Sequence, residues 1–161
     1  MNMLEATLQG DNGALKVVTG SQEIQLGPET LSQRPALRGY EGRKIVLGIR
    51  PEDLEDHELA GETAHGGTLD GKVTLREALG AEIMVHFSVD APPAFTADVK
   101  ELAEDVGEAD RAEAHAKTSS AVMVGRFGAR SRVRPGEAVD VAVDTRQLHF
   151  FDVETGLGIY A

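Results

Sequence analysis

The chain contains no cysteine, so the sequence excludes both a disulfide framework and a thiolate metal site. No apolar run approaches the roughly 20 residues that a helix needs to cross a bilayer. The first residues, Met1 to Glu5, have neither the basic end nor the apolar stretch of a secretory signal peptide. A chain of 161 residues can still bury a core without covalent cross-links. We therefore expect a soluble, intracellular domain with no direct membrane insertion.

Basic residues are scarce relative to acidic ones, with 16 Lys and Arg against 27 Asp and Glu and a net charge of −11. This charge repels phosphate backbones and anionic lipid at long range, so we expect no nucleic-acid partner. One local exception is a run of four arginines with no acid among them: Arg126, Arg130, Arg132 and Arg134. The acidic stretch from Asp98 to His115 is expected to neutralise this cluster.

Alternation of apolar and polar residues dominates the rest of the chain. Successive strand side chains face opposite sides, so this period of two indicates sheets with one buried face. The apolar positions of the expected strands are Leu4/Ala6/Leu8, Leu15/Val17, Ile24/Leu26, Ile45/Leu47/Ile49, Val73/Leu75, Ile83/Val85/Phe87/Val89, Val139/Val141/Val143 and Leu148/Phe150. Turn residues lie between them at 11–13, 19–21 and 79–81. The pattern predicts a mainly β, antiparallel barrel or sandwich.

Two segments break the alternation. Residues 27–41 contain two prolines and are predicted to form an irregular connection. After Pro92-Pro93, the residues from Thr96 to Val106 place apolar side chains at helical spacing and stop at Gly107, which predicts a short helix. We expect this helix to belong to an acidic insertion at about 94–117, outside the barrel.

The sequence contains no motif for catalysis, cofactor binding or a metal. A phosphate-binding loop needs a hydroxyl residue after its Gly-Lys pair, but Val73 follows Gly71-Lys72. The five histidines do not pair at the spacing of a metal-binding face. His86 and His149 alternate with buried positions, so we interpret them as surface or interface residues. The sequence therefore predicts no ATP hydrolysis and no catalytic, cofactor or metal residue in this chain.

Four short phrases occur in a fixed order along the chain. They are Gly48-Ile49-Arg50-Pro51-Glu52, Glu77-Ala78-Leu79-Gly80-Ala81-Glu82, Arg134-Pro135-Gly136-Glu137, and Leu148-His149-Phe150-Phe151-Asp152 leading into Thr155-Gly156. Together they resemble the C-terminal regulatory, TOBE-type domain of the ATP-hydrolysing subunits of carbohydrate import ABC transporters, the maltose and multiple-sugar-import group. The likeness covers nearly the whole chain.

The resemblance implies an oligonucleotide/oligosaccharide-binding (OB)-like TOBE barrel with extra strands and a short helical insertion. Residues 1–161 would then form one regulatory domain, with the ATPase domain, and the ATP and Mg²⁺ that it binds, absent from this chain. Such a domain would meet a second copy of the same subunit, contact the membrane subunits through the parent chain, and lie at the cytoplasmic face of the membrane. A free-standing TOBE-type binder of a small ligand or oxyanion is the alternative.

A dimerisation role makes the positions beside the family phrases candidates for an interface. These candidates are Arg50, Glu52, His149, Phe151 and Asp152. Since Phe151 directly follows Phe150, it should point outward if Phe150 points inward. The core is predicted to contain Ile45, Leu47, Ile49, Val85, Phe87, Val141 and Phe150.

Overall fold

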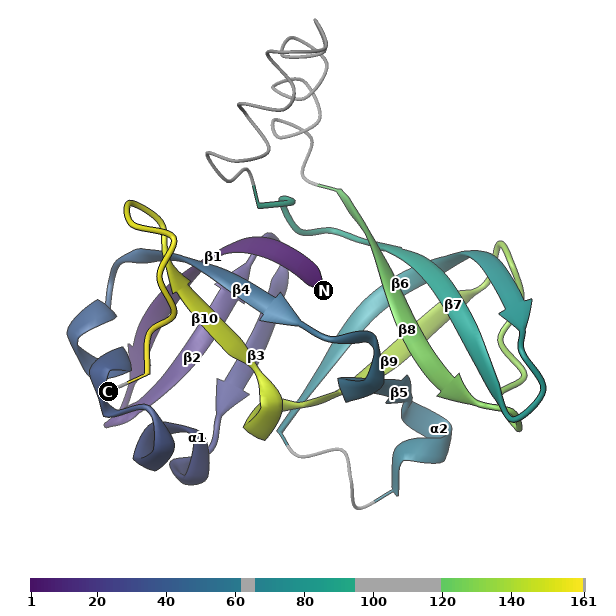
Figure 1. Cartoon of the computed structure of the whole chain (residues 1–161), viewed down its shortest axis with the longest axis horizontal. Coiled ribbons are helices and arrows are strands. Elements are labelled where there is room, and N and C mark those ends of the chain that lie inside the picture. The colour runs from purple at the N-terminus through teal and green to yellow at the C-terminus, as the bar shows by residue number, and fades with distance from the viewer. Residues whose placement is uncertain (62–65, 95–119, 161) are drawn as a thin grey trace, which may run out of the picture.

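The protein was studied as a computed structural model, which describes residues 1–61, 66–94 and 120–160. Two five-stranded antiparallel sheets lie side by side (Figure 1), in the strand orders β10-β4-β1-β2-β3 and β5-β9-β6-β7-β8. The first sheet contains β1 (Asn2–Asp11), β2 (Ala14–Thr19), β3 (Gln22–Leu26), β4 (Lys44–Ile49) and β10 (His149–Asp152). The second contains β5 (Leu54–Asp56), β6 (Gly66–Ala78), β7 (Glu82–Val89), β8 (Ala121–Gly128) and β9 (Ala138–Asp144). The predicted mainly β, antiparallel architecture is confirmed.

One hydrophobic core runs through both sheets. It includes all seven residues predicted to share an interior, each of them at most 1% exposed. Phe87 and Phe127 lie at its centre in the second sheet, with ring centroids 6.4 Å apart. The alternation of the sequence therefore identified the buried face correctly for both sheets.

Leu75 is the exception, because it is 45% exposed although the sequence pattern placed it with Val73 on the buried face. The pairing of β6 with β7 shifts register between Val73 and Leu75. A β-bulge of this kind inserts one residue and reverses the faces beyond it. After the bulge, Arg76 lies opposite the buried Val85, while Leu75 lies opposite His86 on the outer face.

The segment predicted as an irregular connection is helical, so that prediction was wrong. Helix α1 (Pro28–Gln33) is followed by the 3-10 helix η1 (Pro35–Tyr40), each with a proline in its first turn. Proline suits this position because its fixed φ is helical and the missing N–H would have no partner there. The two prolines that we interpreted as signs of an irregular connection therefore mark the starts of two short helices.

Two of the remaining short helices lie at crossings between the sheets, and the third lies between two strands of the second sheet. The 3-10 helix η2 (Pro51–Asp53) joins β4 to β5, α2 (His57–Ala60) follows β5, and the 3-10 helix η4 (Thr145–Gln147) joins β9 to β10. The helix predicted at 96–106 lies outside the described residues, as do the acidic stretch 98–115 and, apart from Ala94, the insertion expected at 94–117.

Two amide side chains connect the sheets, each by a donated and an accepted hydrogen bond to the backbone of one residue in the other sheet. Asn2 of β1 donates to the carbonyl of Val124 at 2.9 Å and accepts from its N–H at 2.8 Å. Gln22 of β3 makes the same pair of hydrogen bonds with the backbone of Asp70 in β6, at 3.3 and 3.0 Å. These contacts give hydrogen-bond partners to backbone groups of Val124, on the edge strand β8, and of Asp70, just before β6 begins to pair with β7.

Candidate functional site

The predicted interface residues lie mainly where β4 and β10 run side by side. Gly48 in β4 pairs with His149 in β10, and Val46 pairs with Phe151. A Cβ atom on Gly48 would lie 2.9 Å from Met1 Sδ and 3.0 Å from the Phe151 ring. The glycine therefore allows both side chains to rest directly on the backbone of β4. Phe151 is half-buried and Met1 is exposed, so this outer face of the first sheet carries apolar surface.

His149 occupies the same face among basic groups. Burial lowers the pKa of its imidazole, and the nearby charges of Arg50 and Arg34 lower that pKa further. Arg34 follows α1 and lies with its guanidinium 5.7 Å from the centre of the Phe150 ring. Because the unfolded chain takes up a proton on this histidine more readily, the stability of the fold decreases as the pH falls through about 6.5.

Replacing Arg50 with Gln should raise the pKa of His149. Removing the guanidinium removes one repulsion of the imidazolium, while burial and Arg34 still hold the pKa below the ordinary value. The measurement is an NMR titration of the His149 ring proton. Arg38→Gln is the matched control, because Arg38 is exposed on η1 and is not among the charges acting on His149. An unchanged pKa in Arg50→Gln would show that Arg50 does not face the histidine.

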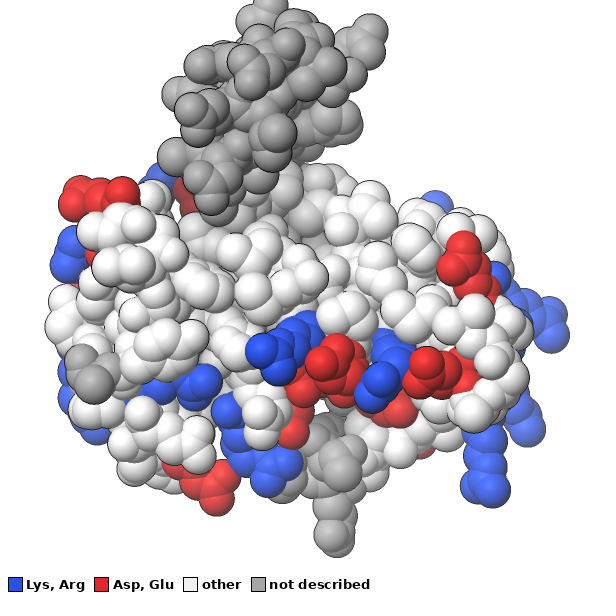
Figure 2. All heavy atoms as spheres, viewed as in Figure 1, with Lys and Arg blue, Asp and Glu red and all other residues white. Residues whose placement is uncertain are grey.

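Glu52 lies in η2, one residue from Asp53. Burial raises the pKa of Asp53, with Glu52 and Asp144 raising it further and Arg50 and Arg126 opposing them. Arg126 of β8 forms an ion pair with Glu82 at 3.3 Å. Basic and acidic side chains alternate in a row across the middle of the face shown in Figure 2. Arg50 and Glu52 are exposed charges of opposite sign, and they follow Gly48, on which Phe151 rests, by two and four residues in the chain.

Asp152 has a different environment from the other four candidates. Its carboxylate accepts hydrogen bonds from the backbone N–H groups of Glu154 and Thr155 at 2.9 and 2.8 Å, and from the Tyr40 hydroxyl at 2.8 Å. These bonds, the one from the Thr155 N–H first, lower the pKa of Asp152 to about 2. The turn is therefore stabilised above about pH 4, and this contribution is lost as the pH falls towards 2. Asp152 holds the turn after β10 and attaches it to η1.

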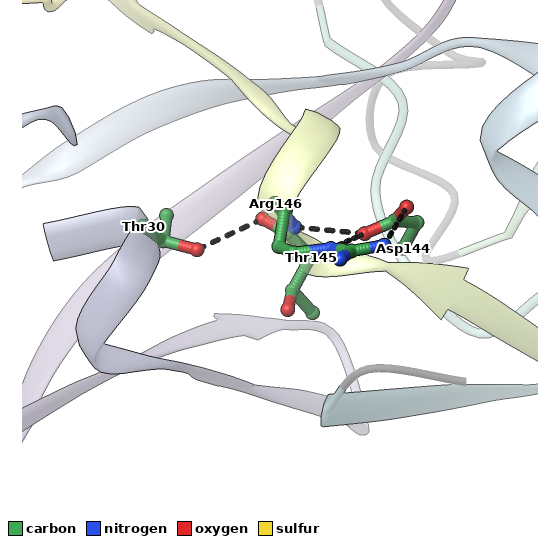
Figure 3. Close-up of polar contacts among 4 residues, drawn as sticks. All are labelled: Thr30, Asp144, Thr145 and Arg146. Atoms are coloured by element: carbon green, nitrogen blue, oxygen red, sulfur yellow. Dashed lines mark hydrogen bonds and ion pairs between the residues drawn. The ribbon is translucent and has the colours of Figure 1, made fainter. Parts of the chain in front are cut away.

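The entry to β10 is fixed by a small polar cluster (Figure 3). Thr30 of α1, which is fully buried, donates its hydroxyl proton to the Thr145 carbonyl at 3.1 Å. Arg146 makes two hydrogen bonds of 3.0 Å to the carboxylate of Asp144. Asp144 also accepts from the Arg146 N–H and so caps η4. This cluster holds the crossing from β9 to β10 against α1, and it sets the position of His149 and Phe151.

The structure brings Arg50 close enough to His149 to act on its pKa, and it places Phe151 on the same face of β10 as His149. Glu52 lies further along the chain in η2, and Asp152 lies at the far end of β10 in its own turn. Arg34 acts on His149 and Tyr40 bonds to Asp152, and neither residue was predicted from the sequence to contact these candidates. Both come from the segment predicted to be irregular, so no face could be assigned to them. The proline spacing at 28 and 35 is the signal that could have identified their helices.

Among the described residues, no group of three or more His, Asp or Glu side chains is placed to hold a metal ion. Within the same residues, no helix has both the length and the apolar character needed to cross a bilayer. The side chains of the site offer apolar contact at Phe151, charge at Arg50 and Glu52, and hydrogen bonding at His149.

Two domain families match successive parts of the chain. Residues 1–54 match the MalK OB fold domain, and residues 47–122 match the TOBE domain. The boundary between the two matches includes Gly48, Arg50 and Glu52, where the first sheet passes into the second.

Relatives extend the match to nearly the whole chain. The sequence is 32% identical over 161 residues to the trehalose/maltose import ATP-binding protein MalK of Thermococcus litoralis, covering 99% of this chain and 34% of the relative. It is 31% identical over 139 residues to the trehalose import ATP-binding protein SugC of Mycobacterium tuberculosis, covering 85% and 33%. It is 27% identical over 159 residues to the oligosaccharides import ATP-binding protein MsmX of Bacillus subtilis, covering 99% and 34%.

The chain spans about a third of the length of these curated relatives. The shared third contains the two sheets and the residues between β4 and β10 that form the site. The chain therefore belongs to the family of OB and TOBE domains carried by the ATP-binding proteins of sugar import.

Proposed function

We propose that this chain is the regulatory and dimerisation part of an ATP-binding subunit of a sugar import transporter. The observation that carries the proposal is the surface formed by Phe151 and Met1 on Gly48, which the exposed Arg50 and Glu52 closely follow in the chain. A two-fold contact buries the same patch on both copies. An apolar centre flanked by one positive and one negative group suits such a contact, because each charge can meet its opposite across the axis.

ATP hydrolysis belongs, in this proposal, to the part of the relatives that this chain does not match. Its Gly71-Lys72 pair lies inside β6, where Gly71 pairs with Val89 on one side and Val139 on the other. Phosphate-binding loops instead leave the backbone N–H groups free to point at the nucleotide. ATP and Mg²⁺ would therefore bind outside this chain, and the chain itself would carry out no chemical step.

The relatives' names concern import of trehalose, maltose and oligosaccharides, and they support a carbohydrate as the transported substrate. By the same reasoning the partners are a second identical subunit and the membrane subunits of the transporter. The domain would then lie in the cytoplasm, against the inner face of the membrane.

Self-association of the chain tests this proposal. We expect a monomer–dimer equilibrium with a dissociation constant in the micromolar range or weaker, since the full transporter adds effective concentration that the isolated domain does not have. The charge of −11 opposes the contact, so moderate salt should strengthen it. Sedimentation velocity at increasing protein concentration measures the equilibrium.

Phe151→Ser should shift this equilibrium towards monomer, because it removes the apolar centre of the patch. Val122→Ser is the matched control: Val122 is 66% exposed on β8 of the other sheet, so its loss should leave dimerisation unchanged. A chain that stays monomeric at near-millimolar concentration contradicts the proposal. Equal dimerisation of wild type and Phe151→Ser would place the contact elsewhere.

A further inference from the structure

A pocket of about 350 Å³ at the end of the second sheet is lined by three arginines and no carboxylate. Its lining residues are Arg76, Ser131, Arg132, Val133 and Arg134. Basic side chains project from this end of the molecule, beyond the turn between β6 and β7 (Figure 2). Three like charges around one pocket repel one another, which is an unusual arrangement in a chain of net charge −11.

The β-bulge in β6 brings Arg76 to this pocket. Without the register shift between Val73 and Leu75, the side chain at 75 would follow that of Val73 onto the inner face. The shift pairs Arg76 with the buried Val85 instead, and the Arg76 side chain stays exposed at the end of the strand, where it lines the pocket. Bulges commonly re-aim a side chain near a functional site, at the expense of local pairing.

The other two arginines lie on a segment that is fixed at both ends. Before them, the buried Ser131 donates its hydroxyl proton to Asp56 Oδ2 at 2.6 Å, and its N–H bonds to the Gly128 carbonyl at 3.0 Å. After them, Gly136 donates to the Val73 carbonyl at 2.8 Å, and the Val73 N–H bonds to Glu137 at 2.9 Å. Val133, between the two arginines, packs against the hydrophobic core.

The three arginines of this pocket form no salt bridge within the described part of the chain. Arg126, the first arginine of the cluster, differs from them because it pairs with Glu82. Arg132 also borders the adjoining pocket that contains Asp56, Glu58, Glu137 and Asp140. Arg76 and Arg134 line the arginine pocket and not the acidic one, so they are the two groups best placed to hold a ligand.

We propose that this pocket binds the phosphate group of a small phosphate monoester. Guanidinium groups present paired N–H donors whose spacing matches two oxygens of a phosphate, and the dianion offsets the repulsion between the arginines. Ser131 is already bonded to Asp56, so its role is to hold the arginine segment in place. The site is separate from the dimerisation surface at Phe151, and the proposal does not depend on self-association.

Titration of the intact chain with inorganic phosphate and with glycerol 3-phosphate tests the site. Calorimetry in a phosphate-free buffer, with sodium chloride added to hold ionic strength constant, should show saturable binding of both anions and none of glycerol. NMR signals of the arginine Nε–H groups should shift at Arg76, Arg132 and Arg134. Arg76→Gln and Arg134→Gln should each weaken binding about tenfold, the loss expected for one charge-assisted contact.

Arg130→Gln is the matched control, because Arg130 is exposed on the same loop but does not line the pocket. It should change the affinity by less than about twofold, as expected for a distant exposed charge. If Arg130→Gln weakened phosphate binding as much as the pocket substitutions do, the binding would depend on general surface charge and the proposal would be wrong. Absence of saturable binding would overturn it as well, and binding of polyglutamate but not of phosphate would assign the arginines to an acidic polypeptide. All three exposed substitutions can be checked for folding by thermal unfolding.

Discussion

Replacing Phe87 with Ala is expected to lower the free energy of unfolding by about 3–5 kcal/mol. The ring is fully buried, lies 6.4 Å from that of Phe127, and rests against Gly71, where an added Cβ would come within 2.8 Å of Phe87 Cδ2. Strands on both sides of β7 thus pack on this one side chain. The truncation leaves a cavity that neighbouring backbone cannot close without breaking sheet pairing. Urea unfolding of both proteins, with equal m-values as a check, measures the loss.

Val122→Ala is the control for this comparison. Val122 lies on β8 next to the same strand but is 66% exposed, so its truncation should cost less than about 0.5 kcal/mol. A loss below about 1 kcal/mol in Phe87→Ala would mean that the core collapses around the missing ring. The predicted interior would then contribute much less to stability than its burial suggests.

The core could be predicted from sequence because each strand repeats one simple rule. Leu4, Leu47 and Phe150 come from three different strands, yet each follows the same period of two and each is buried. The rule fails where an inserted residue interrupts the alternation of side chains along a strand. The bulge at 73–75 is one such place, since nothing in the residues between Gly71 and Leu75 signals an inserted position.

Strand β8 shows a second limit of the same rule, because the sequence pattern did not include it. Its buried positions are Ala121, Met123, Gly125 and Phe127, whereas Val122 points outward. Gly125 is needed there because an added Cβ would come within 2.7 Å of the Phe127 ring and 3.3 Å of Leu54 Cβ. A small residue inside and a β-branched residue outside invert the hydrophobic contrast on which the prediction rests.

The site was predictable only in part, for a related reason. Arg50, His149 and Phe151 flank strands whose faces were assigned correctly, so their shared surface follows from the pairing of β4 with β10. The partners of Asp152 depend on how the chain turns at 153–156 and on where Tyr40 emerges from η1. Those positions are set by tertiary packing, and no periodic pattern records them.

Replacing Gly20 with Ala is expected to cost about 2–5 kcal/mol, from backbone strain and overpacking together. Gly20 forms the turn between β2 and β3 with φ at +58°, a conformation that residues with a Cβ rarely adopt. An added Cβ would also overlap the Asp90 carbonyl and come within 2.7 Å of Ala91 Cα. These are backbone atoms, held by the bond from the Ser21 N–H to Asp90 at 3.1 Å, so they cannot rotate away.

Gly13→Ala separates the two causes. Gly13 forms the turn between β1 and β2 with φ at +87°, but no atom lies within 4 Å of a Cβ added to it. It should therefore show the strain alone, about 1–2 kcal/mol. Thermal and urea unfolding of both variants measure the difference, which reports the close approach of the β2–β3 turn to the end of β7. Equal losses in the two variants would mean that this contact yields easily.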